Sequence, residues 1–245
     1  MMVAAAGVAE AASVTSSWGY INNVYGKSYK GFANVGYNQW ASSYFQIQTQ
    51  NGLNVASGWM GAQVRTYRET TLCDGSSIEY NGAAAHSETA YGLVKCGAGN
   101  YKANGIGYVW NGNGYNSATF PTTPYLYVPA NMATGTAQAS PLLRTSLEQT
   151  AQPAGTLPFG HNARHETFGS AAAATTVADE PDLIEAFGDS GAKGYVLRKD
   201  LEKLPSSPSV ARSVSGGTKI ALYDSSGITR LGWFTLHQSV VPNGK

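Results

Sequence analysis

Short runs of alternating apolar and polar residues, separated by turn-forming residues, make up the sequence from Trp18 to Val128. The clearest run is Tyr44 to Thr49, and the Asn51-Gly52 pair that follows is typical of a two-residue hairpin turn. Further runs of this kind are Leu53 to Tyr67, Glu88 to Cys96, Tyr101 to Trp110 and Tyr115 to Phe120, the last two joined by a turn at Asn111 to Gly114. Because these runs come without a helical period longer than a turn or two, we predict a mainly β protein, folded here as an antiparallel sandwich or barrel.

The composition changes near Ala130. Up to that residue the chain carries thirteen of its fifteen tyrosines, four of its five tryptophans and both cysteines, but only eleven charged residues. A region rich in Tyr, Gly, Asn and Ser and poor in Lys and Glu is common in β-rich proteins that work outside the cell. Charged residues make up 13% of the chain, against about 25% in a typical soluble domain. Since the net charge is +1 and no basic run occurs, neither a nucleic acid nor an anionic membrane is predicted as a partner.

The extreme N-terminus indicates a targeting segment. Val3 to Ala12 is a run of mostly small apolar residues, and Ala9-Glu10-Ala11 within it matches the A-x-A cleavage site of a secretory signal. No Lys or Arg precedes the run, so an Ala-rich arm is the alternative. We interpret 1–11 as a signal-peptide remnant and expect a secreted, extracellular protein. No other apolar stretch approaches the ~20 residues needed to cross a bilayer, so no membrane span is predicted.

Cys73 and Cys96 are the only cysteines, and both lie in the Tyr/Gly-rich region. A single pair in a secreted β domain predicts a disulfide bond, with two buried thiols as the alternative. Closing the loop between them would stabilise the fold by roughly 3 kcal/mol. Neither cysteine has a Cys-x-x-Cys partner or a nearby pair of histidines, so no metal site is predicted there.

Three segments are expected after the N-terminal remnant. A Tyr/Gly-rich β domain covers 12–129 and ends in a stretch with three prolines. The stretch 130–156 lacks clear periodicity and is interpreted as a linker. The last segment, 157–245, is predicted to be a small β region of two hairpins, which turn at Asp189 to Gly191 and at Asp224 to Gly227.

A series of short motifs follows the predicted linker. They are Asn162 to Ser170, Glu180 to Ile184, Gly194 to Val196, Leu222 to Asp224 and Gly232 to Phe234. Together they resemble a small β module of secreted proteins of Gram-positive, actinobacterial-type bacteria, with the pattern Asn-x-x-Gly-x-Thr-Tyr-Gly-Ser followed by Gly-Tyr-Val. His165 stands where that pattern has Gly. Because the module has no assigned function, the resemblance implies location and lineage and carries no chemistry.

The histidines do not form a catalytic or metal-binding pattern. His161 and His165 have the i,i+4 spacing of metal ligands on a helix, but Gly160 precedes them and the segment has the character of a turn. We therefore expect exposed loop histidines. His86 and Ser87 are neighbours on a predicted strand, where successive side chains point to opposite faces, so they do not make a base and nucleophile. No catalytic residue, metal or cofactor is predicted.

The densest acidic run consists of Asp179, Glu180, Asp182 and Glu185. Paired acids hydrolyse glycosides when they flank a cleft, which clustering in sequence does not indicate. The Asp-x-Asp-x-Asp pattern of a calcium loop is absent. We interpret the run as a solvated acidic turn. The glycines of Gly97-x-Gly99 and Gly105-x-Gly107 lack a phosphate-binding context, and turns, bulges or close strand packing are their expected roles.

Aromatic residues are the strongest candidates for a functional surface. Tyrosine combines a large rigid contact area with a polar tip, which suits the binding of protein or glycan, although half of such residues in a sandwich would be core. The candidate binding surface consists of Trp18, Tyr20, Tyr25, Tyr29, Tyr37, Trp40 and Tyr44.

The sequence thus predicts a secreted or cell-surface, non-catalytic β protein for extracellular binding or structural interaction, in adhesion, envelope association or self-assembly. Its expected partner is a cell-surface glycan or an extracellular protein. Two alternatives stay open. A secreted hydrolase acting on cell-wall polymer would need clustered acids or a Ser–His contact in a cleft, and a secreted toxin or protease inhibitor would need a protruding rigid loop.

Overall fold

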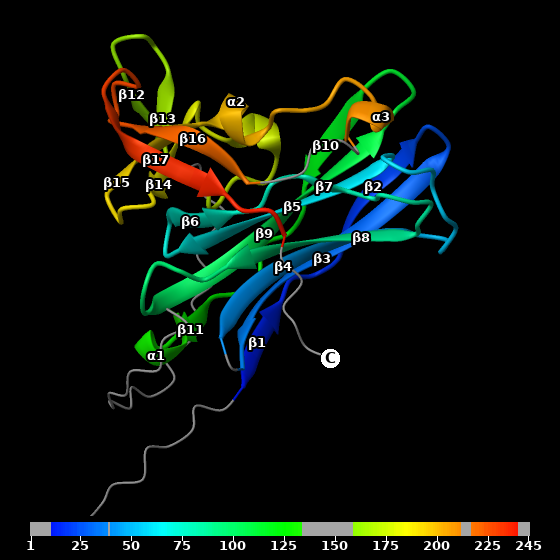
Figure 1. Ribbon diagram of the computed structural model, residues 1–245, viewed down its shortest axis with the longest axis horizontal. Coiled ribbons are helices and arrows are strands. Elements are labelled where there is room, and N and C mark those ends of the chain that lie inside the picture. Colours follow the sequence, from blue (N-terminus) through cyan, green and yellow to red (C-terminus); the bar gives the residue numbers. More distant parts are fainter. Residues whose placement is uncertain (1–10, 39, 134–158, 212–216, 240–245) are drawn as a thin grey trace, which may run out of the picture.

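The computed structural model describes residues 11–38, 40–133, 159–211 and 217–239 (Figure 1). Within these ranges the protein is mainly β, and its strands form two sheets that do not close into a barrel. The predicted fold class is therefore confirmed as a sandwich. All but the last residue of the interpreted signal remnant 1–11 lies outside the described residues, as does most of the interpreted linker 130–156.

The small sheet has five strands, all antiparallel, in the order β1-β3-β4-β8, with β2 also paired to β3. The strands are β1 (Ala12–Thr15), β2 (Gly19–Val24), β3 (Lys27–Tyr37), β4 (Ala41–Thr49) and β8 (Ser87–Leu93). Buried and partly exposed residues alternate along β3 and β4, so one face of the sheet is covered and the other faces outward.

The large sheet has twelve strands, with the main path β10-β9-β5-β6-β14-β15-β16-β17. Its first-half strands are β5 (Met60–Arg68), β6 (Thr71–Gly75), β7 (Glu79–Tyr80), β9 (Gly99–Trp110), β10 (Tyr115–Thr119) and β11 (Leu126–Val128). Its second-half strands are β12 (Gly160–His161), β13 (Thr167–Gly169), β14 (Leu183–Phe187), β15 (Lys193–Leu197), β16 (Thr218–Tyr223) and β17 (Arg230–Leu236). The β6–β14 and β13–β14 pairs are parallel, so the sheet is mixed.

The described helices are all short. They are α1 (Ala130–Ala133), the 3₁₀ turn η1 (Val177–Asp179), α2 (Arg198–Leu201) and α3 (Pro208–Ala211). Figure 1 shows α2 in the part of the molecule formed by β12 to β17, where α2 contacts β15. The Leu201 side chain of α2 is buried in the core there.

The main core lies between the two sheets. Phe45 and Ile47 point inward from β4 and are fully buried, as are Met60 and Val64 on β5. A Cβ atom on Gly105 of β9 would lie 1.8 Å from Cδ2 of Phe45, and one on Gly107 would lie 2.7 Å from Cδ1 of Ile47. The expected role of these glycines is confirmed, because only hydrogen leaves room for the side chains of the facing sheet.

The two halves of the chain share the large sheet. Leu72 on β6 pairs with Ala186 on β14, and Ser76 forms an isolated bridge with His237. A second core lies here, formed by side chains from both halves that include Leu72, Ile184 and Phe234. The C-terminal strands therefore continue the first half's sheet.

The disulfide between Cys73 and Cys96 is present, which confirms the prediction. Cys73 belongs to β6 of the large sheet, and Cys96 follows β8 of the small sheet. Their Cα atoms are 5.9 Å apart. The bond therefore joins the two sheets of the sandwich and serves a structural role.

The predicted hairpin at Asn51-Gly52 is wrong. Gly52 does adopt a turn conformation, with φ 71°, but β4 pairs with β3 and β8 while β5 pairs with β9, β6 and β7. The chain crosses from one sheet to the other after β4, and β5 begins only at Met60. The predicted turns at Asn111 to Gly114, Asp189 to Gly191 and Asp224 to Gly227 do join the hairpins β9–β10, β14–β15 and β16–β17.

Candidate binding face

The outward face of the small sheet displays alternate residues of β3, β4 and β8. Lys30 pairs with Gln48, Phe32 with Gln46 and Asn34 with Tyr44 across the β3–β4 ladder. The next ladder places Thr89 beside Gln46 and Tyr91 beside Tyr44. Because directly paired residues share a face, these side chains all project to the same side, away from the core. We call this surface the outer face.

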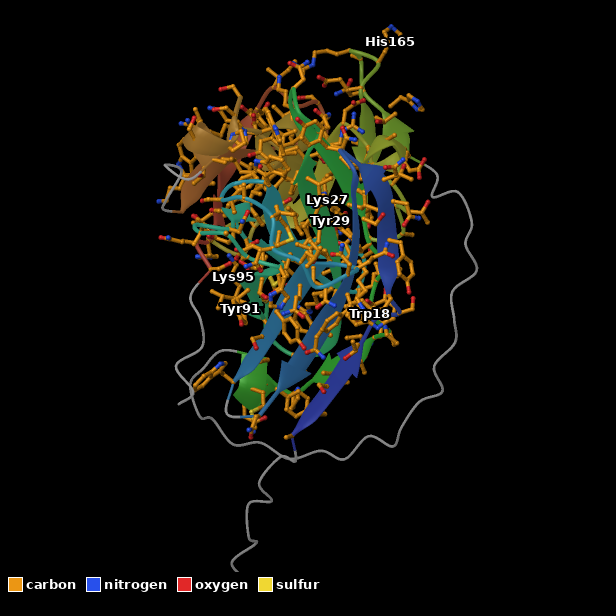
Figure 2. The ribbon with its side chains drawn as sticks, turned by 90° about the vertical axis from the view of Figure 1, so that its right-hand side faces the viewer. Trp18, Lys27, Tyr29, Tyr91, Lys95 and His165 are labelled. Atoms are coloured by element: carbon orange, nitrogen blue, oxygen red, sulfur yellow. A yellow bond between two sulfur atoms is a disulfide. The ribbon has the colours of Figure 1, made fainter. Side chains whose placement is uncertain are left out.

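Four aromatic rings form a continuous row across the outer face. Trp18, in the loop before β2, meets Phe32 edge to face with ring centroids 4.7 Å apart. Phe32 meets Tyr44 at 5.9 Å, and Tyr44 meets Tyr91 at 6.1 Å. Figure 2 looks onto this sheet and shows Trp18 and Tyr91 on either side of the blue strands. The contacts therefore link the region of β2, through β3 and β4, to β8; we call these four residues the aromatic row.

Amide and hydroxyl side chains surround the aromatic row. The Gln46 amide donates to Thr89 Oγ1 at 3.3 Å, and the Asn34 amide donates to Thr15 Oγ1 at 2.8 Å. Burial raises the pKa of Tyr44, with a further contribution from Tyr91, so its phenol stays neutral at physiological pH. The outer face thus offers neutral donors and acceptors beside its rings.

Charge is scarce on the outer face. Among the outward positions of the described small-sheet strands, Lys30 is the one charged residue, and its Nζ lies 4.8 Å from the ring centroid of Trp18. The one acidic residue of these strands, Glu88, pairs with buried Ile47 and so shares the inner face. A cation over an aromatic face is attracted by the ring quadrupole, which holds Lys30 against the row.

The seven residues predicted as a binding surface separate into four groups. Trp18, Tyr20 and Tyr44 belong to the outer face; Tyr20 is 60% exposed and pairs with Lys30. Tyr25 lies in the β2–β3 turn at one end of the sandwich, where its ring meets Trp59 at 5.4 Å. The remaining groups are Trp40, exposed in the β3–β4 turn, and the inward-facing pair Tyr29 and Tyr37.

Tyr29 does not belong to a surface. It is fully buried in the main core, because the odd-numbered positions from 29 to 35 of β3 face the other sheet. Tyr37 is half-buried and packs against the same core. The predicted set also missed Phe32 and Tyr91. The period-two pattern of a strand would have indicated both residues. Phe32 lies two residues from Lys30 and so shares its face, and Tyr91 lies within the predicted strand Glu88 to Cys96.

The acidic run is only in part the solvated turn that we expected, since Asp179 is exposed but Glu180 is not. Glu180 is buried, and both of its oxygens accept hydrogen bonds from Arg65 Nη1, at 2.8 and 2.7 Å. Arg65 on β5 is itself fully buried and also contacts Glu202 at 3.3 Å. Burial opposes the charge of Arg65, but Glu180 and the neighbouring acidic groups more than offset this and raise the pKa of Arg65. A buried carboxylate needs such a partner, which sequence clustering did not reveal.

A cavity of about 630 Å³ lies between β10 and the segment around η1 and α2. Its lining includes Ser117, Thr119, Thr175, Thr176, Arg198 and Glu202. Glu202 is the one carboxylate among the described lining residues. Burial raises the pKa of Glu202, although Arg65 opposes that rise. The lining thus presents hydroxyl groups, the two basic side chains Arg198 and Lys199, and a single acid that already pairs with Arg65, without paired acids or a histidine.

The two candidate metal-ligand histidines are both exposed, as expected, but only His165 lies in a loop. His161 ends β12, and His165 lies in the following turn with φ 63°. Figure 2 shows His165 at the tip of a loop, at the end of the molecule farthest from the aromatic row. Across the described ranges no cluster of three His, Cys, Asp or Glu residues could hold a metal ion.

Comparison of the chain with protein-family models, curated proteins and solved structures finds no match. Among the helices of the described ranges, none has the length and apolar character needed to cross a bilayer. The functional argument therefore rests on the chemistry of the outer face.

Proposed function

We propose that the protein is a secreted or cell-surface binding protein that attaches to its partner through the outer face of the small sheet. The observation that carries this proposal is the aromatic row, in which four rings contact one another across the sheet. Trp18 at its end is 42% exposed, and Tyr20 beside Lys30 is 60% exposed. Phe32, Tyr44 and Tyr91, the other three members of the row, are partly exposed. A contiguous aromatic surface of this kind supports an interaction site, since Trp and Tyr are the commonest anchors of such sites.

The extracellular part of the proposal rests on two features. The Cys73–Cys96 bond joins the two sheets, and disulfides persist in oxidising compartments outside the cytoplasm. The Tyr/Gly-rich first half of the chain contains few charged residues, as in many secreted β proteins. The resemblance of the last 80 or so residues to a secreted Gram-positive module agrees with this location. The proposed partners are a cell-surface glycan or an extracellular protein.

The test measures attachment of the full chain to intact Gram-positive cells, to neutral and anionic polysaccharides, and to immobilised extracellular-matrix proteins. We expect Tyr44→Ala and Tyr91→Ala each to weaken binding, since truncating an aromatic anchor costs about 2 kcal/mol or more, or roughly thirtyfold in Kd. Tyr127→Ala is the matched control, because Tyr127 is 59% exposed on β11 of the other sheet. Circular dichroism verifies that each variant is folded.

Two results would overturn the proposal. One is an absence of binding to every probe, and the other is binding that Tyr44→Ala and Tyr91→Ala leave unchanged. Loss of binding in Tyr127→Ala in place of the outer-face variants would move the site to the large sheet.

A further inference from the structure

The chemistry of the outer face defines the class of partner more narrowly, and this inference rests on the proposed function. We infer that the ligand is an uncharged polysaccharide, bound as a single chain that lies across β3, β4 and β8 along the aromatic row. Three observations lead to this assignment: the path of the rings, the polar groups between them, and the lack of charge.

The path of the rings fits a polymer. Ring centroids follow one another at 4.7, 5.9 and 6.1 Å from Trp18 to Tyr91, so a ligand that contacts all four must be extended. Pyranose rings present apolar C–H faces that pack against aromatic rings, and a repeating chain presents one such face after another. The row therefore matches a chain of sugars better than a single small molecule.

The tilt of the rings selects a single twisted chain. Planes of successive rings differ by 66°, 81° and 47°, so the four rings do not form a flat platform. The antiparallel strands beneath them carry the right-handed twist of such sheets. A flat crystalline polymer surface would touch only part of this row, whereas a flexible chain can follow it.

The polar groups on the outer face match sugar hydroxyls. Gln46 and Asn34 lie beside the rings, and Gln48, Ser87 and Thr89 share their face. Side-chain amides and hydroxyls both donate and accept hydrogen bonds, as sugar hydroxyls do, and they carry no charge. Tyr44 adds a neutral phenol at the centre of the row.

The scarcity of charge argues against an anionic polymer, and the uncharged polar groups beside the rings favour a glycan over a protein. An anionic polymer needs a basic patch, and the outward positions of the described strands provide one cation, Lys30, which lies over Trp18. Aromatic rings also anchor protein partners, but here the rings are flanked by uncharged amides and hydroxyls, with Leu93 as the one large aliphatic side chain at these positions, which favours a glycan. A neutral glycan needs neither a basic patch nor an aliphatic core.

The first experiment is affinity electrophoresis of the full chain in gels that contain soluble hydroxyethylcellulose, galactomannan, laminarin or polygalacturonate. Sedimentation with crystalline cellulose and crystalline chitin is run in parallel. We expect retardation by at least one soluble neutral polysaccharide, weaker association with the crystalline polymers, and little change in about 1 M NaCl, where charge interactions are screened. Phe32→Ala, Tyr44→Ala and Tyr91→Ala should each weaken the interaction tenfold or more, and Tyr127→Ala should not.

The second experiment separates failure of this inference from failure of the proposed function. Intact Gram-positive cells are treated either with periodate, which oxidises sugar diols, or with protease, and attachment is measured again. Attachment that periodate abolishes and protease spares supports the inference. If attachment depends on Tyr44 and Tyr91 but survives periodate and disappears with protease, the partner is a protein and the inference falls while the proposed function stands. Binding to polygalacturonate alone, lost in salt, would likewise overturn it.

Discussion

Gly105 on β9 allows the two sheets to approach each other closely at the centre of the sandwich. Phe45 is fully buried and its ring packs on Phe120 with centroids 4.9 Å apart. The ring of Phe45 also lies directly over Gly105, where any Cβ atom would fall within 1.8 Å of it. Phe45 belongs to the strand that carries Tyr44 on its other face, so this packing also positions the aromatic row.

We predict that Gly105→Ala destabilises the protein by about 3 kcal/mol, because overpacking of a tight core forces side chains or backbone to move. Gly232→Ala is the control, since a Cβ on that strand glycine meets no atom within 4 Å. Urea unfolding of both variants measures the effect. Phe45→Leu should recover part of the loss in the Gly105→Ala background. Equal stability of the two glycine variants would show that Phe45 does not confine Gly105.

At the residue scale, the sequence indicated a set of aromatic residues as a candidate surface but did not determine which way each one faces. Tyr29 and Tyr44 both lie in strand-like runs rich in Asn, Gln and Ser, yet Tyr29 is core and Tyr44 is on the outer face. A strand has two faces, and the one that is buried depends on which sheet packs against it. That packing brings together strands that lie far apart in sequence. Glu180 was misjudged for the same reason, because its partner Arg65 lies 115 residues away.

At the scale of elements, the Arg65–Glu180 pair attaches the segment after η1 to strand β5. Both side chains are almost inaccessible to solvent, at 1% and 0% exposure, and Arg65 Nη1 contacts both oxygens of Glu180. Removing one member of a buried pair leaves the other charge without compensation. Arg65 can therefore be buried with its counter-charge only when β14, which follows Glu180, is docked beside β6.

We predict that Glu180→Gln costs about 3 kcal/mol of unfolding free energy, measured in urea, since Arg65 stays buried and loses its counter-charge. Glu185→Gln is the matched control. Glu185 also joins the two halves, through Thr71 at 2.8 Å, but the partner in its ion pair, Lys193, has a side chain that is 54% exposed. That variant should cost less than about 1 kcal/mol. A Glu180→Gln variant as stable as Glu185→Gln would mean that Arg65 finds water or Glu202 as a sufficient partner.

Hairpins were predictable where the turn chemistry and the pairing are both local. The turns at Asn111 to Gly114, Asp189 to Gly191 and Asp224 to Gly227 each join two strands that pair with each other. The Asn51-Gly52 turn has the same chemistry, yet its flanking strands belong to different sheets. Local sequence encodes the change of direction, whereas Phe45 and Ile47 of β4 find their contacts with β9, which follows some fifty residues later.

On the scale of the whole molecule, the aromatic row exists only after folding. Trp18, Phe32 and Tyr44 come from the first strands, but Tyr91 is brought beside Tyr44 by the β4–β8 ladder. The sequence placed the candidate surface in the first half, because aromatic side chains concentrate there, and could not place β8 next to β4. The sequence also could not predict that both halves share the large sheet, because the pairing of β6 with β14 is a single parallel pair, Leu72 with Ala186.

The same aromatic content makes the whole fold sensitive to alkali. Burial raises the pKa of Tyr29 and of Tyr101 to about 12, and it also raises those of Tyr67, Tyr80 and Tyr108. The unfolded chain releases these protons near pH 10. Above that pH the folded state therefore binds more protons than the unfolded state, so the free energy of unfolding decreases as the pH rises. This contribution to stability is complete below about pH 10 and is lost through about pH 12.

We predict that the protein unfolds cooperatively between about pH 10 and 12, with phenolate absorbance and loss of near-ultraviolet circular dichroism appearing together. Tyr29→Phe tests the cause directly. The Tyr29 hydroxyl is buried and has no hydrogen-bond partner in the described structure, so its removal leaves no group unpaired. Because the variant has one fewer phenol to ionise on unfolding, its alkaline midpoint should shift to higher pH while its stability at neutral pH changes little. Full phenolate formation in a protein that keeps its near-ultraviolet signal would show that the tyrosines ionise without unfolding, and would refute the coupling between the aromatic core and alkaline stability.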